Sequence, residues 1–308
     1  MKQPDRPLYA LFWMTLSAVG FSVMAVFVKT LGPSVPQFEL VFFRSFVNLL
    51  VVLPWMLHTR EPVLPPRKSL VGLLTLRGLA GFGGLSCLFY TVTHLPLSIA
   101  MLLGWTSPVF VILFSRIFLG ERLTRKQLGA VLFAFAGMSL LVLKVGPSAS
   151  GILALPFLPF LIGIIGAAFS GLAYVAVRAA TARVGVNTII FYFVGVSTLL
   201  SAPLAARNFT IPTWEIAFQL IFLGLFASLG QFTMTQGFRH APAALVSTMS
   251  LLNAAFSALF GWFLFGERLN SIQWVGLWVV AGAIGYLGFY GYRPDKTSKA
   301  ALVSQQPG

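Results

Sequence analysis

Arg44 and Arg77 are the residues whose type and position most directly suggest chemistry in this sequence. Each lies about nine residues inside a long apolar run of the kind that crosses a membrane as a helix. An arginine at the centre of such a helix costs roughly 2.5–3.5 kcal/mol on insertion scales, so it normally faces the bundle interior or a water-filled cavity. A guanidinium group binds carboxylate or phosphate through paired hydrogen bonds. The two arginines are therefore predicted to bind an anion, and the alternative is that they snorkel or pair with a carboxylate inside the protein.

Polar and aromatic side chains near the middle of other apolar runs form a second set of candidates. Trp105 and Ser107 precede Pro108, and a proline leaves a carbonyl of the preceding turn unpaired, which neighbours or a substrate can satisfy. A buried asparagine such as Asn253 also needs partners. The alternative for each residue is that it only joins two helices by a hydrogen bond. The predicted substrate-binding residues are Arg44, Arg77, Tyr90, Trp105, Ser107, Tyr174, Gln231 and Asn253.

Glu39 lies near the start of an apolar run whose own loop has no basic residue. It is a candidate for proton coupling, and the alternatives are pairing with Arg44 or capping of the helix N-terminus, which favours a carboxylate. Glu121 and Glu267 occur where helices are expected to end, and we interpret both as loop residues that terminate helices.

The sequence contains no pattern for a metal site or a cofactor. It has three histidines and a single cysteine, Cys87, which lies in an apolar run, so no disulfide framework or cysteine-rich metal site is available. His94 and His240 are expected in loops at opposite faces and cannot share a metal. A glycine-rich phosphate loop and a nucleophilic triad are also missing from the sequence, and we predict a protein without cofactor, metal or enzymatic activity.

Composition defines the elements that must position these residues. Of 308 residues, 57% are hydrophobic and 9% are charged, with a mean hydropathy of +0.88, whereas a soluble domain carries about a quarter charged residues. A soluble enzyme, a nucleic-acid binder and a disordered scaffold are thereby excluded. The net charge of +14 is explained by basic cytoplasmic loops rather than by a nucleic-acid partner.

We predict ten membrane-spanning helices, because a bilayer core needs about 20 apolar residues per helix. The runs are continuously apolar rather than alternating, which argues against a transmembrane barrel. The first run is long enough to span and lacks a cleavage site of small residues. The predicted spans are 8–29, 36–57, 69–92, 96–118, 125–144, 156–178, 186–206, 214–237, 241–264 and 271–291.

The short-loop charges predict that both termini are cytoplasmic. With ten spans and that orientation, 15 of the 21 Lys and Arg residues lie on the cytoplasmic side and 4 on the other, Arg44 and Arg77 being the remaining two. Such an excess is the usual positive-inside asymmetry. Nine spans would place the tail outside and remove the asymmetry.

The chain repeats itself at a constant offset. Residues 94–123 align with 240–269, and both segments share a His-x-Pro and a Gly-Glu-Arg-Leu motif 146 residues apart. Phe21-Ser22 meets Phe169-Ser170 at a slightly larger offset. Five spans per repeat is an odd number, so the second half must enter the membrane from the opposite side. Inverted repeats of this kind are used by many secondary transporters, which bind substrate near the midplane between the halves.

The repeated motifs resemble the end of an EamA domain. The residues that carry the resemblance are Thr106-Ser107-Pro108, Phe118-Leu119-Gly120-Glu121-Arg122-Leu123, Gln127-Leu128-Gly129 and Ala136-Gly137, with Leu264-Phe265-Gly266-Glu267-Arg268-Leu269, Gln273 and Ala281-Gly282 in the second half. One departure is that Ala254 stands at the position of Pro108. Two such domains are the plan of the drug/metabolite transporter superfamily. The resemblance implies a ten-helix carrier with a central cavity, and members of the superfamily carry amino acids, nucleotide-like metabolites, carboxylates, vitamins and drugs.

We therefore predict an all-α membrane protein with two inverted five-helix repeats, 8–144 and 152–291, and a disordered cytoplasmic tail, 292–308. The expected function is secondary transport of a small anionic or zwitterionic metabolite by alternating access, in a bacterial inner membrane. Because the sequence has no ATPase motif, a proton or counter-substrate gradient would supply the energy. Three alternatives remain open at this point: an exporter of apolar or cationic drugs with structural arginines, an intramembrane enzyme, and a non-transporting receptor. A homodimer is also left open.

Overall fold

The computed structural model describes residues 6–65, 67–95, 103–142, 156–266 and 270–290, and every regular element among them is a helix. The first half contains α1 (Pro7–Leu31), α2 (Gln37–His58), α3 (Lys68–His94), α5 (Ser107–Phe114), the π-helical turn η1 (Ser115–Leu119) and α6 (Arg125–Val142). The second half contains α7 (Phe157–Thr181), α8 (Val186–Ala206), α9 (Trp214–His240), α10 (Ala243–Met249), α11 (Leu252–Phe265) and α12 (Ser271–Tyr290).

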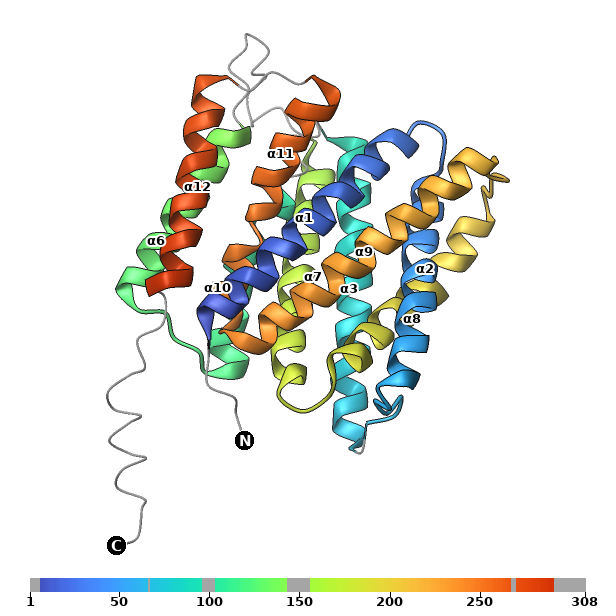
Figure 1. Ribbon diagram of the computed structural model, residues 1–308, viewed down its shortest axis with the longest axis horizontal. Coiled ribbons are helices and arrows are strands. Elements are labelled where there is room, and N and C mark those ends of the chain that lie inside the picture. The colour runs from blue at the N-terminus through green and yellow to red at the C-terminus, as the bar shows by residue number, and fades with distance from the viewer. Residues whose placement is uncertain (1–5, 66, 96–102, 143–155, 267–269, 291–308) are drawn as a thin grey trace, which may run out of the picture.

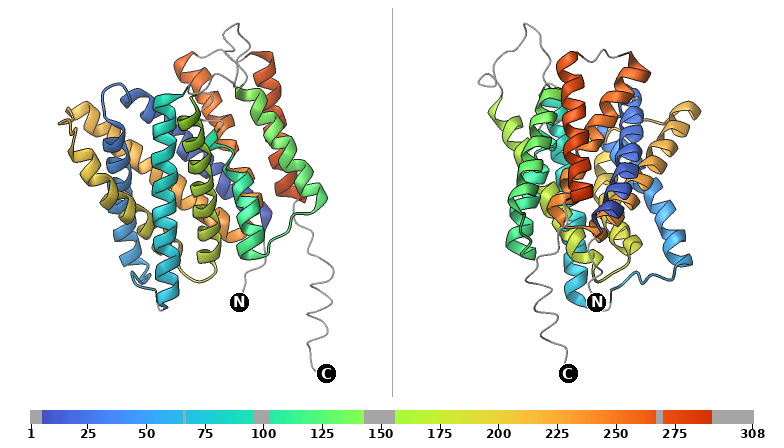
Figure 2. Two further views of the ribbon diagram at one scale, coloured as in Figure 1. Left: turned by 180° about the vertical axis from the view of Figure 1, so that it is seen from behind. Right: turned by 60° about the vertical axis from the view of Figure 1, so that its left-hand side comes forward.

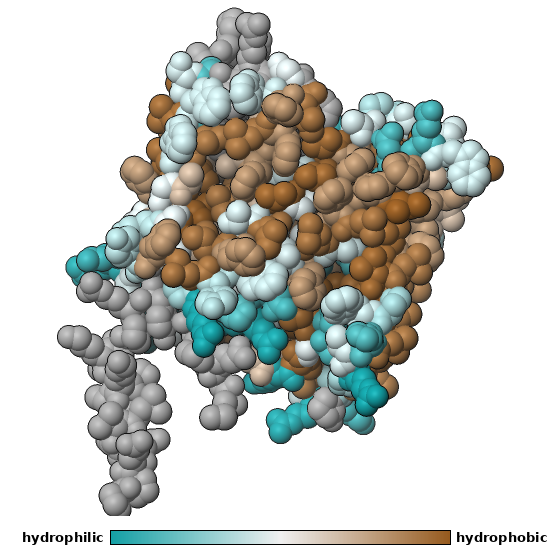
Figure 3. Space-filling view, viewed as in Figure 1, coloured by the Kyte–Doolittle hydropathy of each residue, from teal (hydrophilic) through white to brown (hydrophobic). Residues whose placement is uncertain are grey.

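The helices are built to cross a membrane. Within the described residues, eight helical segments are long and apolar enough to do so, and Ser107–Leu119 is a shorter apolar helix. Together with α6, these segments correspond to the ten predicted spans. The surface in Figure 3 is largely hydrophobic over the helices and hydrophilic at the lower end of the bundle. Large apolar side chains such as Leu199, Trp278 and Phe289 are 74%, 69% and 69% exposed, which suits a surface that faces lipid.

The two halves have inverted topology, as the repeat predicts. In Figure 1, α1 rises from the lower end while its counterpart α7 descends, and α3 rises while α9 descends. The pairs α2 and α8, α5 and α11, and α6 and α12 are opposed in the same way. The beginning of α1 and the end of α12 consequently lie at the same end of the bundle.

Packing between the halves repeats the same symmetry. Helix α1 packs along α9 as α3 packs along α7, α2 packs on α8, and α6 packs on α12 at one edge of the bundle (Figure 2). Glycines permit the closest crossings: a Cβ at Gly20 would lie 2.9 Å from the backbone nitrogen of Gly230, and one at Gly84 would lie 3.2 Å from the carbonyl oxygen of Gly166. Because the backbones approach so closely, small residues at these crossings hold the halves together.

The repeated loop motif has a local explanation. Gly120 and Gly266 follow η1 and α11 with φ of 67° and 64°, a left-handed conformation that glycine adopts without steric cost. The next helix then starts with a reciprocal cap in each half. In α6, the Thr124 backbone N–H donates to Oε1 of Gln127 at 2.7 Å, and α12 repeats this between Asn270 and Gln273 at 3.0 Å. The repeated glycine and glutamine therefore stop one helix and start the next.

Two predicted spans are broken, which corrects the sequence-based expectation of one continuous helix in each. Turns interrupt the fourth span at Trp105–Thr106 and the ninth at Ser250–Leu251. At these turns the N–H of Thr106 donates to Leu103 and that of Asn253 donates to Ser250, a three-residue spacing in place of four. Residues 96–102 of the fourth span, like 267–269, lie outside the described residues. Pro108 accounts for the first break, whereas the second has no proline beside it.

Candidate functional site

A cavity of about 230 Å³ lies between the two halves beside the broken helices. Four of the predicted substrate-binding residues line it: Trp105, Ser107, Tyr174 and Asn253. The rest of its wall comes mainly from apolar or small residues of α1, α3, α7 and α9, including Met14, Phe21, Met24, Gly84, Gly166 and Met234. Since a water in the liquid takes up about 30 Å³, the volume corresponds to roughly eight waters and suits a small metabolite.

Arg44 and Arg77 lie in the interior on α2 and α3, outside the cavity wall. Arg77 is 2% exposed, and the Nε atoms of both arginines are buried without a hydrogen-bond partner. The two guanidinium groups are close enough to repel each other. Neither forms an ion pair or hydrogen bond with a described residue, so the predicted alternative of an internal carboxylate partner is not observed among those residues.

Aromatic rings connect the arginines to the cavity. The Arg77 guanidinium carbon lies 4.2 Å from the centroid of the Phe193 ring, a cation–π contact. Tyr174 lines the cavity and is also near enough to interact electrostatically with both arginines. Tyr174 is therefore the residue through which the cavity adjoins the arginine pair.

Three other predicted residues lie away from the cavity wall. Tyr90 stacks on His94, with ring centroids 4.0 Å apart. Gln231 is buried, and its Nε2 has no hydrogen-bond partner. Glu39 is fully buried and accepts hydrogen bonds at Oε2 from the backbone nitrogen and Oγ1 of Thr210, at 3.2 and 3.0 Å. It therefore binds the segment before α9 rather than Arg44, and its role in coupling stays a prediction.

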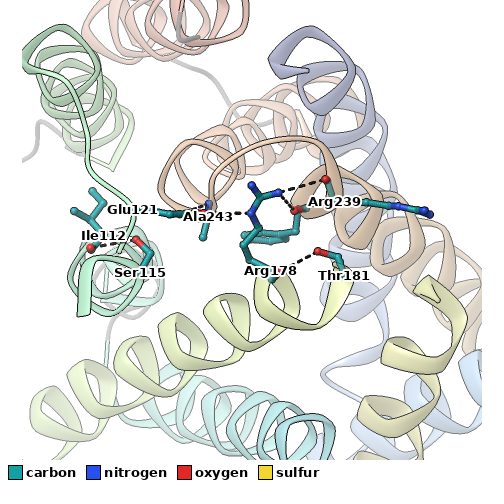
Figure 4. A network of polar contacts seen from close by, with 8 residues as sticks. Ile112, Ser115, Glu121, Arg178, Thr181, Arg239 and Ala243 are labelled. Atoms are coloured by element: carbon teal, nitrogen blue, oxygen red, sulfur yellow. Dashed lines mark hydrogen bonds and ion pairs between the residues drawn. The ribbon is translucent and has the colours of Figure 1, made fainter. Parts of the chain in front are cut away.

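An ion pair joins four helix ends below the cavity (Figure 4). Arg178 Nε, at the end of α7, lies 3.2 Å from Oε1 of Glu121. Arg178 Nη1 also donates to the carbonyl oxygens of Phe238 and Arg239 at the end of α9. Oε2 of Glu121 accepts from the first N–H of α10, on Ala243, at 2.8 Å. We call these contacts the Glu121–Arg178 network.

The Glu121–Arg178 network lies at the end of the bundle that carries most of the basic loops. The Tyr174 and Phe238 rings, with centroids 5.3 Å apart, pack between it and the cavity. The cavity extends the other way, towards Thr91, Gly104 and Gly163. The Glu121 and Arg178 side chains also line a larger pocket of about 930 Å³ at this end of the bundle. Glu121 is a loop residue after η1, as expected, and its ion pair with Arg178 was not indicated by the sequence.

Asn253 belongs to a polar cluster that sequence reasoning missed, in which Asn253 and Ser257 line the cavity. Ser22 Oγ on α1 donates to Oδ1 of Asn253 at 2.8 Å, and Ser257 Oγ on α11 lies 3.3 Å from the same oxygen. The spacing of four residues between Asn253 and Ser257 places them on one helix face. The contact between these two residues could therefore have been predicted from the sequence. No local pattern connects Ser22 to Asn253, which lies 231 residues further along.

Inverted helical repeats around a cavity beside broken helices are the architecture of many membrane transporters. Comparison with known proteins is more specific. The model of the EamA-like transporter family matches residues 8–143 and 157–289. The chain therefore belongs to the EamA-like transporter family, as a multi-pass membrane protein that carries small metabolites rather than an enzyme.

Its relatives carry different substrates. The chain is 34% identical over 265 residues to the pseudopaline exporter CntI of Pseudomonas aeruginosa, covering 85% of this chain and 89% of that protein. It is 27% identical to an S-adenosylmethionine uptake transporter of Rickettsia bellii, over 83% of this chain and 84% of the relative. It is 26% identical to a riboflavin transporter of Brucella anthropi, over 82% and 88%. One crystal structure matches with a TM-score of 0.77 at 20% identity, covering 96% of this chain and 99% of the other, which shows the common fold.

Proposed function

We propose that this transporter carries a small metabolite with a carboxylate or phosphate group, and that Arg44 and Arg77 bind this group beside Tyr174. The two inverted halves move relative to each other, so that the cavity faces each side of the membrane in turn. A proton or counter-substrate gradient drives the cycle.

The observation that carries the proposal is a pair of like charges without a counter-charge. The Arg77 side chain is buried and the Arg44 side chain is half-buried, the two guanidinium groups repel each other, and neither has an acidic partner among the described residues. Burial of an unpaired charge is strongly unfavourable. An anion between or beside the two groups removes both the repulsion and the missing hydrogen bonds.

A cationic drug fits this arrangement poorly, because two positive charges lie next to the cavity wall at Tyr174. An apolar drug would use the methionine and aromatic part of the wall and would not depend on the arginines. The names of the relatives include export and uptake, so the direction of transport needs its own measurement.

The test starts with a thermal-shift screen of the purified protein against carboxylates, phosphates, organic cations and apolar compounds. The compounds that bind are then measured by direct binding and by flux in proteoliposomes. We expect anions to bind, Arg44→Lys to weaken binding partially because the planar fork is lost, and Arg44→Ala and Arg77→Ala to weaken it by about tenfold or more.

The control is Arg207→Ala, since Arg207 is an exposed arginine at the end of α8. All values are normalised to folded protein. If Arg44→Ala and Arg77→Ala both keep wild-type affinity on that basis, the arginines are structural and the anion site is wrong.

A further inference from the structure

Asn253 is held in one orientation by its neighbours. Ser22 Oγ lies 2.8 Å from Oδ1 of Asn253 and 3.0 Å from its backbone carbonyl oxygen. Ser257 Oγ lies 3.3 Å from Oδ1 and 3.2 Å from Ser22 Oγ. Since a serine hydroxyl can donate and the amide oxygen can only accept, Oδ1 is the acceptor for both serines and is already engaged.

The other end of the same carboxamide is unused. The amide nitrogen of Asn253 forms no hydrogen bond with a described residue, and the side chain lines the cavity. A carboxamide nitrogen carries two N–H donors. These donors are therefore available to a molecule in the cavity, and they need an acceptor such as a carboxylate or carbonyl oxygen.

The opposite half has no equivalent group. At the repeat offsets, Asn253 corresponds to Ser107, Ser257 to Val111 and Ser22 to Ser170. The arginine pair also occurs in the first half only, because the equivalent residues of the second half are Tyr192 and Leu223. Two different donor groups thus adjoin the cavity, the arginine pair beside Tyr174 and the amide of Asn253, and much of the remaining wall is apolar.

We propose that Asn253, positioned by Ser22 and Ser257, is a second binding subsite for a carboxylate or carbonyl oxygen of the transported molecule. The inference rests on the proposed function, since the anionic group of the same molecule binds at Arg44 and Arg77. The substrate class that fits both subsites is a small, elongated organic anion with a hydrogen-bond acceptor at each end and an apolar middle. One end of this molecule binds at the arginines and the other at Asn253, so the molecule binds in one orientation.

The probes for the test are straight-chain α,ω-dicarboxylates of three to eight carbons, each compared with the monocarboxylate of equal length. Binding to the purified full-length protein is measured by isothermal titration calorimetry. We expect at least one dicarboxylate to bind about tenfold more tightly than its monocarboxylate, because the second acceptor gains hydrogen bonds at Asn253. Asn253→Ser introduces the residue that stands at the equivalent position 107. It should reduce this ratio to near one, because the second acceptor of the dicarboxylate then loses its hydrogen bonds.

Two further variants separate orientation from folding. Ser22→Ala and Ser257→Ala keep the amide but release it, and each should lower the ratio by a few fold. Ser228→Ala is the matched control, because the Ser228 hydroxyl bonds only the Gly224 carbonyl of its own helix and lies outside the cavity wall; it should leave the ratio at the wild-type value.

The outcomes distinguish the two proposals. If Arg44→Ala abolishes binding of both probe classes while Asn253→Ser keeps the wild-type ratio, the subsite is wrong and the arginine site stands. If neither class binds to the wild-type protein, or if binding is indifferent to Arg44→Ala and Arg77→Ala, both proposals are wrong. A ratio that falls with Asn253→Ser but not with Ser228→Ala supports the subsite.

Discussion

At the scale of single residues, the position of the Arg77 guanidinium depends on its two neighbours in space, Phe193 and Gly81. Its guanidinium carbon faces the Phe193 ring at 4.2 Å. A desolvated cation–π contact of this kind is worth about 2 kcal/mol, which offsets part of the cost of burying the charge. On the other side, a Cβ at Gly81 would collide with Nη1 of Arg77 and would lie 2.7 Å from the Phe193 ring. Gly81 therefore leaves the space that the guanidinium occupies.

Gly81→Ala should consequently displace Arg77 or Phe193. We expect it to lower the free energy of unfolding by about 1–3 kcal/mol, the usual cost of overpacking, and to weaken anion binding. Gly72→Ala on the same helix is the control, because a Cβ there meets nothing within 4 Å and alanine favours helix by roughly 0.5–1 kcal/mol. The measurements are thermal unfolding in detergent and binding of the anion found in the screen. Equal stability and affinity for both variants would show that Arg77 does not need this space.

At the scale of helices, the Glu121–Arg178 network connects several helix ends at one end of the bundle. The carboxylate of Glu121 satisfies an N–H at the start of α10, and Arg178 satisfies carbonyls at the end of α9. Charges of these signs also interact favourably with the respective helix ends. One ion pair thereby links the ends of η1, α7, α9 and α10, which must separate if the cavity is to open on that side.

Disruption of the network should make the cavity reachable from that end. In a Cys87→Ser background no other cysteine is present, so Ser17→Cys, whose position lines the cavity, can be labelled selectively. We expect Glu121→Gln and Arg178→Gln to raise its labelling rate by a membrane-impermeant maleimide several-fold from the network side, and Arg183→Gln, a nearby arginine, to leave it unchanged. Labelling that is equally slow in all variants would mean that the network does not hold this end closed.

At the scale of the whole molecule, the repeat produces symmetric packing but asymmetric chemistry. Equivalent helix pairs cross in the same way, with glycines at corresponding crossings. The buried arginines, the Asn253 amide and most loop cations each occur on one side only. A symmetric scaffold permits the same movement in both directions, whereas an asymmetric cavity binds its substrate in a single orientation.

The orientation in the membrane remains a prediction that follows from the basic loops. We expect the beginning of α1 and the end of α12, which share one end of the bundle, to face the cytoplasm. A reporter that is active only in the cytoplasm, fused after residue 300, should be active, and the same reporter inserted at residue 210, between α8 and α9, should be inactive. The reverse pattern would invert the assignment, and the end that carries the Glu121–Arg178 network would then face outwards.

The sequence alone determined the class of fold, the number of segments and the inverted repeat. These properties depend on hydropathy, length and recurring local motifs, and each is set within about 20 neighbouring residues. The cap glycines, Gly120 and Gly266, and the capping residues Gln127 and Gln273 are local in the same sense. Arg44 and Arg77 stood out for a similar reason, because a charge within an apolar run is visible without knowledge of its neighbours.

Only the tertiary structure decided which of these residues meet. It placed Trp105, Ser107, Tyr174 and Asn253 on one cavity, set Tyr90 apart against His94, and broke the ninth span without a proline. It also joined Ser22 to Asn253 and Glu121 to Arg178, pairs that lie 231 and 57 residues apart in the chain. Contacts of this range depend on how helices cross, and the crossings depend on close packing between the halves. No pattern within a single helix contains that information.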